Sequence, residues 1–492
     1  MMGPALRVVA TLILAWGLWW AWRSLRADRA VVTIVGIGLA VRAIAGALLF
    51  WVSYLELPAG ASMQLGNGLW FYALDGQSYF QFAEAAAALG LPGIWNLDPT
   101  LPSGTYIQAL ALTLYLVGPV TSAALLLNLG AYLATCVAVV WIARRLEAAR
   151  PALLFALTAV SLTPSWILWS TQPLKDTFFI ASIVVFIAPL VVWLDWLRGD
   201  RVRARVVVAA LLLQWAAFYA VAGVRWYFSL FLLVGLVVSS VWALMLRGSG
   251  RARAALFAAL AVVLLAQAVP TAAGPYVPEW IRNVLRPPSV EVALAALGEA
   301  PGGTRFIVHR ARLGHAAAGG GTEIRAPVRE LPVEFVRADT AGFPAEGDGV
   351  GEAMAIWSKL TAGERVFIGA AAMLVPRVIG ETAGWVEIGG GRGLFAFAEV
   401  DTVLLDVVIL LAAALIVWQW RAGRVPHPAF WFVLAMTILV AVPLAYQAGN
   451  FGTLFRQRNM VAVGVMVLPL FMTPRRERPD ADRRTSDATA RT

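Results

Sequence analysis

The chain has 492 residues, of which 60% are hydrophobic and only 14% are charged, and its mean hydropathy is +0.74. This composition excludes an ordinary soluble globular protein and is typical of a polytopic membrane protein. The formal net charge of +10 comes almost entirely from arginine. It does not by itself indicate nucleic-acid binding, so we expect membrane lipid, and no nucleic acid, among the partners.

Eleven apolar runs of the sequence are long enough to cross about 30 Å of hydrocarbon. Because lipid offers the backbone no hydrogen-bond partners, each run is predicted to be a helix rather than a strand. The predicted fold class is an all-α polytopic membrane protein with about eleven transmembrane helices. The runs are roughly residues 6–22, 31–53, 121–143, 152–170, 177–197, 206–223, 228–246, 254–272, 403–420, 430–447 and 458–473.

Arginines cluster in alternate connections between these runs, and flanking arginines are retained on the cytoplasmic side of a membrane. The pattern predicts a multi-pass membrane protein with its amino terminus outside and its carboxyl terminus in the cytoplasm. The first run is predicted to be an uncleaved signal anchor. The clusters contain Arg23, Arg26 and Arg29; Arg144, Arg145 and Arg150; Arg198, Arg201, Arg203 and Arg205; Arg247, Arg251 and Arg253; Arg421 and Arg424; and the tail arginines from Arg475 to Arg484.

This topology divides the chain into four predicted parts. Short apolar stretches at 106–117 and 361–378 are predicted to be helices lying on or dipping into the membrane interface. The parts are a membrane domain (1–272) with eight helices and a first outer loop (54–120), an extracytoplasmic segment (273–402) with a small α+β portion, the last three helices (403–473) and a disordered tail (474–492).

The first outer loop carries a polar and aromatic stretch, residues 70–82, which contains Asp75 and Tyr79. Asp75 is one of few carboxylates that the topology places just outside the bilayer. Asp98, in Asn96-Leu97-Asp98-Pro99, is either a second carboxylate of the same site or a turn former. Because a carboxylate can remove the proton of an attacking hydroxyl, we expect the chemistry of this chain in this loop.

Arg42 lies near the middle of the second predicted helix. A charge at that depth costs at least about 2.5 to 3.5 kcal/mol on insertion scales, so it normally faces a partner or a wet cavity. Two interpretations stay open and are equally weighted: a structural ion pair with another buried group, or an anion site for a lipid phosphate.

Two further outer segments carry cations. The turn at 164–176 ends in Lys175 and Asp176. A helix-capping role explains Asp176. Lys175 does not help to set the membrane orientation from an outer loop, whereas contact with a phosphate would explain it. The last outer loop contains Asn450, Arg456 and Arg458, and its two arginines violate the positive-inside trend. They suit a phosphate ester or pyrophosphate, or alternatively anionic lipid headgroups.

Over roughly residues 31–250, this organisation resembles the GT-C glycosyltransferases, which include the protein mannosyltransferases and the bacterial lipid A and lipopolysaccharide core transferases. The resemblance rests on the acidic motif Leu74-Asp75-Gly76-Gln77-Ser78-Tyr79, the amphipathic helix after it, and the turn with Pro164, Trp169-Ser170 and Lys175-Asp176. It implies transfer of a sugar from a polyprenyl-phosphate donor to a glycan, lipid or protein acceptor on the outer face of a bacterial inner (cytoplasmic) membrane.

The resemblance also implies roles for individual residues. Asp75 would activate the acceptor hydroxyl or help to hold a divalent cation such as Mg²⁺ or Mn²⁺, although the family often has two adjacent acids where this chain has Asp75-Gly76. The donor phosphate would be bound by Arg42, Lys175, Arg456 and Arg458, and supporting or acceptor contacts would come from Tyr79, Asp98, Asp176 and Asn450.

Two other functions remain open. A transporter or flippase for a lipid-linked glycan predicts a continuous polar path with charges in several helices, which the sequence supports poorly. A non-catalytic assembly protein of a polysaccharide pathway predicts that the outer polar residues are scattered. The transferase predicts that they converge on a shared pocket, because reacting groups must reach hydrogen-bonding range.

Overall fold

The computed structural model describes residues 4–25, 28–97, 103–197, 202–225, 392–446 and 458–475, together with isolated positions at 228–239 and 361–370. The predicted run at 254–272, most of that at 228–246, most of the extracytoplasmic segment and nearly all of the predicted tail lie outside the described residues. The predicted interfacial helix at 361–378 is described at only five positions, four of them helical.

Within the described residues, six helices are long and apolar enough to cross a membrane. Each coincides with a predicted run, so the all-α membrane architecture is confirmed, while the total of eleven spans stays a prediction. The six are α1 (Pro4–Ser24), α2 (Arg29–Tyr54), α6 (Ala123–Arg145), α9 (Asp176–Leu197), α10 (Ala204–Val224) and α19 (Arg392–Arg421).

The predicted run at 152–170 is two helices, α7 (Arg150–Leu162) and α8 (Pro164–Ser170), which meet at an angle of 50°. The break lies at Thr163, whose backbone is extended. Proline disfavours a helical conformation in the residue before it and cannot donate the next backbone hydrogen bond. Pro164 therefore begins a new helix, and the bent pair counts as a seventh candidate span.

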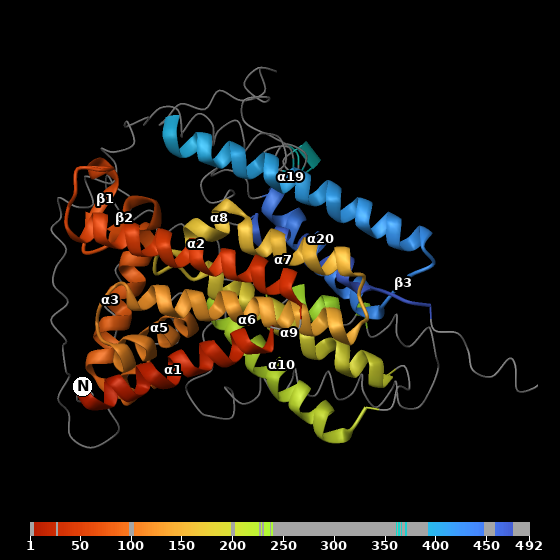
Figure 1. Cartoon of the computed structure of the whole chain (residues 1–492), viewed down its shortest axis with the longest axis horizontal. Coiled ribbons are helices and arrows are strands. Elements are labelled where there is room, and N and C mark those ends of the chain that lie inside the picture. The colour runs from red at the N-terminus through yellow and green to blue at the C-terminus, as the bar shows by residue number, and fades with distance from the viewer. Residues whose placement is uncertain are drawn as a thin grey trace, which may run out of the picture.

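The runs predicted at 430–447 and 458–473 are also helical. They form α20 (Pro428–Tyr446) and then α22 (Asn459–Val467), which continues into the 3-10 helix η3 (Leu468–Phe471). In the bundle, α9 lies near the centre (Figure 1) and contacts α6, α10 and α20. Its side chains Phe186 and Trp193 are fully buried, as its continuous apolar sequence requires.

The first outer loop folds into short elements at one end of the bundle, where β1, β2 and α3 lie together (Figure 1). Strands β1 and β2 pair antiparallel, with Gln64 opposite Trp70. The elements are η1 (Ala61–Met63), β1 (Gln64–Gly66), β2 (Leu69–Trp70), η2 (Phe71–Ala73), α3 (Leu74–Ala88), α4 (Gly90–Trp95) and α5 (Gly104–Val117).

Helix α5 confirms the helix predicted at 106–117, but its apolar side chains are packed inside the bundle. Tyr106, Ile107, Leu110 and Leu114 are all fully buried, and α5 contacts α3, α6 and α10. With 14 residues the helix spans about 21 Å. It therefore supports the outer loop from inside the protein instead of offering an apolar face to surrounding lipid.

Contacts between the arginine-bearing connections gather them at the same end of the bundle. Arg144 donates to the carbonyl of Ser24 (3.4 Å), Arg150 pairs with Asp28 (3.3 Å) and Arg424 donates to the carbonyl of Glu147 (2.8 Å). Strands β3 (Val425–Pro426) and β4 (Met472–Thr473) pair antiparallel at this end. Three of the six predicted arginine clusters therefore meet at one end of the bundle. The alternation over the rest of the chain and the assignment of this end to the cytoplasm stay predictions.

Candidate functional site

The first outer loop and the turn between α8 and α9, residues 171–175, contact each other directly. The hydroxyls of Tyr72 and Thr171 are 3.1 Å apart, and the side-chain amide of Gln172 donates to the carbonyl of Gly68 at 3.3 Å. Burial raises the pKa of the Tyr72 hydroxyl, so this group stays protonated at physiological pH. Two of the segments that the sequence singled out are thus brought together.

Asp75 lies in the first turn of α3 and is exposed. A carboxylate there is stabilised by the positive end of the helix dipole. Its neighbour Gly76 packs on the turn so closely that a Cβ would lie 3.1 Å from Cγ of Pro173 and 3.2 Å from its carbonyl oxygen. The glycine after the acid therefore permits the close approach that holds Asp75 beside the turn.

Lys175 is half-buried between two groups of the first outer loop. Its ammonium donates to the hydroxyl of Ser103 at 2.7 Å and lies 5.3 Å from the ring centre of Tyr79. The ring face attracts the cation electrostatically. The hydrogen bond to Ser103 and the contact with the Tyr79 ring therefore hold Lys175 in a defined orientation.

Asp176, the first residue of α9, forms a buried ion pair with Arg225 at the end of α10 (3.0 Å). Asp176 opens α9 as predicted, and it is also paired with a cation that our interpretation of the sequence missed. The sequence did indicate that Arg225 is unusual. It lies on the predicted outer side, against the positive-inside trend, as Arg458 does. The pair ties α9 to α10 at the residue that follows Lys175 in the chain.

Arg42 is 1% exposed, and its partners are main-chain oxygens. It donates to the carbonyls of Gly38 (3.1 Å), Val160 (2.9 Å) and Ser161 (2.6 Å), and its guanidinium lies 4.1 Å from the ring centre of Tyr132. Val160 and Ser161 lie in the last turn of α7, where the bend at Thr163 leaves carbonyls without helical partners. Among the described residues, no carboxylate pairs with Arg42. The described part of the structure therefore does not contain the ion pair of the first interpretation.

Arg458 is buried and forms an ion pair with Asp401 of α19 (2.6 Å). The other oxygen of Asp401 accepts from the backbone N–H of Ser165 at the start of α8 (2.9 Å), and the Ser165 hydroxyl donates to the Asn459 side chain (3.3 Å). Arg458 therefore has an acid as partner where we expected a phosphate. The network fastens α8 to α19 and α22.

Three predicted site residues, Asp98, Asn450 and Arg456, lie outside the described residues. Within the part of the chain that the structure describes, no three His, Cys, Asp or Glu side chains are grouped as metal ligands. Binding of a divalent cation at Asp75 stays a prediction.

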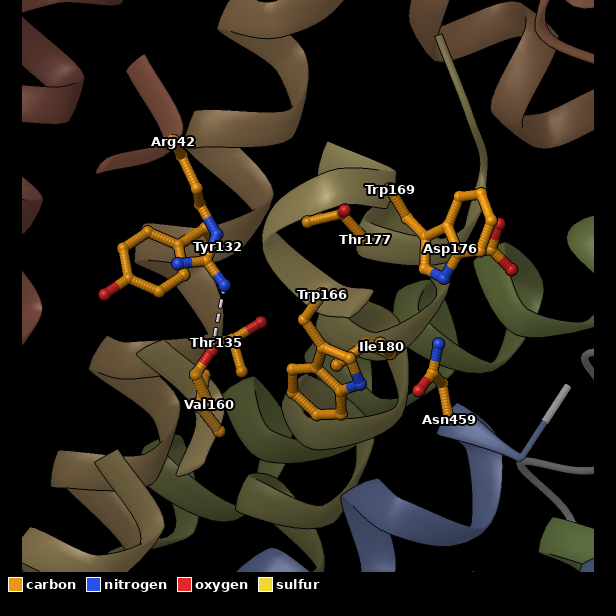
Figure 2. Close-up of a pocket in the computed structure, with 10 residues that line it drawn as sticks. All are labelled: Arg42, Tyr132, Thr135, Val160, Trp166, Trp169, Asp176, Thr177, Ile180 and Asn459. Carbon is orange, nitrogen blue, oxygen red and sulfur yellow. Dashed lines mark hydrogen bonds between the residues drawn. The ribbon is translucent and has the colours of Figure 1, made fainter. Parts of the chain in front are cut away.

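A cavity inside the bundle joins three separately predicted regions (Figure 2). Its lining includes Arg42 of α2, Trp166 of α8, Asp176 of α9 and Asn459 of α22. The volume open to the centre of a water molecule is about 10 Å³, which is room for roughly one water. Arg42 and Asp176, two of the predicted site residues, both line this cavity, but it is too small for a sugar phosphate. Asp75, Lys175 and Arg458, which we expected to share a pocket, are not among its lining residues.

No protein-family model, no curated protein and no solved structure matches this chain. The geometry that bears on function is therefore that of the end of the bundle formed by residues 54–120. There α3 carries the exposed carboxylate of Asp75 and packs through Gly76 against the turn that carries Lys175. Such a pair can accept a proton at the carboxylate and stabilise negative charge at the ammonium.

Proposed function

We propose that this chain is a membrane glycosyltransferase of the GT-C type, which moves a sugar from a polyprenyl-phosphate donor to an acceptor at the outer end of the bundle. The observation that supports it is the packing of Gly76 against Pro173, together with the contact of Lys175 with Tyr79 and Ser103. These contacts bring the acidic start of α3 and the lysine turn into one surface.

In the proposed reaction, the carboxylate of Asp75 takes the proton of an acceptor hydroxyl while the hydroxyl oxygen bonds to the anomeric carbon of the sugar. The bond between that carbon and the phosphate oxygen breaks, and its electron pair leaves with the polyprenyl phosphate. Lys175 stabilises the negative charge of the departing phosphate. Arg42 and Arg458 are engaged with partners inside the bundle, so the proposal does not use them.

The exposure of Asp75 suits this role. An acceptor on the outer surface can reach it without entering the hydrocarbon region, and the long isoprenoid chain of the donor can stay in lipid beside α2 or α3. The transporter alternative is less well supported, because three buried carboxylates of the described helices are each paired locally with an arginine: Asp176 with Arg225, Asp401 with Arg458, and Asp195 with the more exposed Arg145. Arg42 is buried without a carboxylate partner and is held by main-chain carbonyls.

The proposal is tested with the full chain in liposomes that contain synthetic undecaprenyl phosphate carrying labelled glucose, mannose or arabinose, and an envelope extract as acceptor source. We expect release of undecaprenyl phosphate with at least one donor. Asp75→Asn should lower the rate by about 100-fold or more, because general base catalysis typically contributes that much.

The matched control is Glu84→Gln, which neutralises another exposed carboxylate on the same helix. It should keep the wild-type rate, and both variants should keep the wild-type melting temperature. A folded Asp75→Asn protein with full activity would remove Asp75 from the proposed role, and no release with any donor would count against transfer from a polyprenyl phosphate.

A further inference from the structure

Helix α3 presents a polar stripe to its surroundings. Its exposed side chains recur at every third or fourth position, which places them on one face of the helix. None of them is a large apolar residue. They are Asp75, Ser78, Gln81, Glu84 and Ala88. A stripe of this composition is typical of a helix face in contact with water.

The exposed surface becomes apolar where α3 ends. Leu89 follows α3 directly, Leu91 and Trp95 belong to α4, and the three side chains are 40%, 44% and 64% exposed. We call these three side chains the α4 patch. The sequence from 85 to 97 contains no charged residue. A cluster of exposed apolar side chains marks a surface that contacts lipid or another protein.

The other side of α4 fixes the patch to the bundle. Ile94 is fully buried, and α4 contacts both α3 and α5. Gly93 permits this close packing, because a Cβ there would collide with Leu89 and would lie 2.8 Å from the carbonyl oxygen of Ala86. The α4 patch is therefore a fixed part of the folded surface.

The α4 patch lies close to the start of α1. A Cβ on Gly90 would lie 3.9 Å from the ring of Tyr115 in α5, and a Cβ on Gly118, just after α5, would lie 3.6 Å from Nη1 of Arg7 in α1. Tyr115 and Gly118 are less than one helical turn apart. Helix α5 thus brings the beginning of α4 next to the first turns of α1.

Lipid must cover this part of α1. Leu6, Val8 and Val9 are all more than half exposed, and almost none of the apolar length of α1 is buried within the protein. The α4 patch therefore continues a lipid-facing surface at the end of a candidate membrane span. Tryptophan is enriched at that depth, where hydrocarbon meets the headgroups.

We propose that the α4 patch is an interfacial anchor, which inserts into the lipid headgroup region at this end of the bundle. The two leucines enter the boundary of the acyl chains, and the indole of Trp95 lies among the headgroups. A second copy of the chain fits less well, because three partly exposed side chains offer far less than the roughly 800 Å² per partner of a stable interface. The polar stripe of α3 stays in water beside the anchor.

The anchor is tested by spin labelling of the full chain in nanodiscs. Nitroxides are attached to Leu91→Cys and Trp95→Cys, with Gln81→Cys on the polar stripe as the matched control. The native Cys136 is fully buried, so the unmodified protein serves as the unlabelled blank. The accessibility of each nitroxide to oxygen, which concentrates in lipid, is compared with its accessibility to a water-soluble nickel complex.

We expect the ratio of oxygen to nickel accessibility to be about tenfold higher at residues 91 and 95 than at residue 81, because an interfacial apolar face lies about 5–10 Å into the headgroup and acyl boundary. All three labelled proteins should keep the wild-type melting temperature, since the substituted side chains are exposed.

Equal ratios at the three positions would overturn the proposal, because they would place the α4 patch in water. Labels at 91 and 95 that are shielded from both reagents would also overturn it. Dipolar coupling between such labels would then show that a second copy covers the patch. These outcomes are independent of glycosyl transfer, because every readout reports the location of a side chain.

Discussion

The ammonium of Lys175 lies 2.7 Å from the hydroxyl of Ser103, across 72 residues of sequence. Ser103 precedes α5 in a left-handed conformation (φ 66°). Its hydroxyl lies 3.4 Å from the carbonyl of Val224, and this contact positions it in its turn. The lysine that we propose to meet the leaving phosphate is thus oriented by a residue just before α5, and α5 is itself anchored in the bundle.

The first prediction concerns this lysine. Lys175→Met should lower kcat for sugar transfer by about 100-fold, because it removes a cation that stabilises the leaving group. Ser103→Ala should lower kcat by only about fivefold, since it removes one orienting hydrogen bond worth about 1 kcal/mol. Initial rates with the labelled donor measure both. Equal losses in the two variants would contradict a direct role for Lys175.

The second prediction concerns the contact between Gly76 and Pro173. Gly76→Ala should lower the free energy of unfolding by about 1–3 kcal/mol, because the added methyl group forces α3 away from the turn. It should also lower the transfer rate by displacing Asp75. Ser78→Ala, at an exposed position of the same helix, is the control. Unfolding in denaturing detergent, with transfer measured in parallel, checks both effects.

The third prediction concerns the Asp401 and Arg458 pair. Arg458→Met should destabilise the protein by about 3–5 kcal/mol, because it leaves a buried carboxylate without its cation. Adding Asp401→Asn should recover most of that loss, since the amide oxygen is neutral and still accepts from the Ser165 N–H. A double-mutant cycle on unfolding free energies measures the coupling. Additive losses would show that the two residues act independently.

The fourth prediction is a pH dependence at the other end of the bundle. Asp28 caps α2 by accepting from the N–H of Ala30 at 2.8 Å, and this hydrogen bond, together with Arg150, lowers the pKa of Asp28 below its ordinary value of 3.8. A lowered pKa adds stability above the ordinary value, and that stability is lost as the pH falls below about 4.

Melting temperatures between pH 3 and pH 7 check this dependence against Asp28→Ser, which keeps a capping oxygen without a charge. The wild-type protein should lose more stability on acidification than the variant does. Parallel curves for the two proteins would mean that Asp28 contributes no measurable pH dependence.

Much of the architecture could be predicted from the sequence because lipid constrains helices strongly. Apolar runs marked α1, α2, α6, α9 and α10 to within a few residues, since their ends coincide with arginines or turn residues. The break inside the run at 152–170 is also consistent with local chemistry, because Pro164 interrupts it. The burial of α5 could not be predicted, because a 14-residue apolar helix is equally suited to an interface and to a core.

The site could be predicted only in part. Proximity of Asp75 to the lysine turn followed from placing both on the outer side, and the contacts at Gly76 and Tyr79 agree with it. The partners of the buried cations Arg42 and Arg458 could not be predicted from the sequence, because pairing depends on which helices are adjacent. Arg225, Asp401 and the carbonyls of α7 are far in sequence from the residues that they satisfy.

The bend at Thr163 has a consequence for biosynthesis. Arg42 enters the membrane with α2, but two of the carbonyls that accept its hydrogen bonds belong to residues 118 and 119 positions later in the chain. A ribosome must therefore complete α7 before this arginine reaches its final environment. The nascent chain carries an uncompensated charge through several insertion steps, and a truncation that ends before α7 should leave α2 prone to slip out of the bilayer or to be degraded.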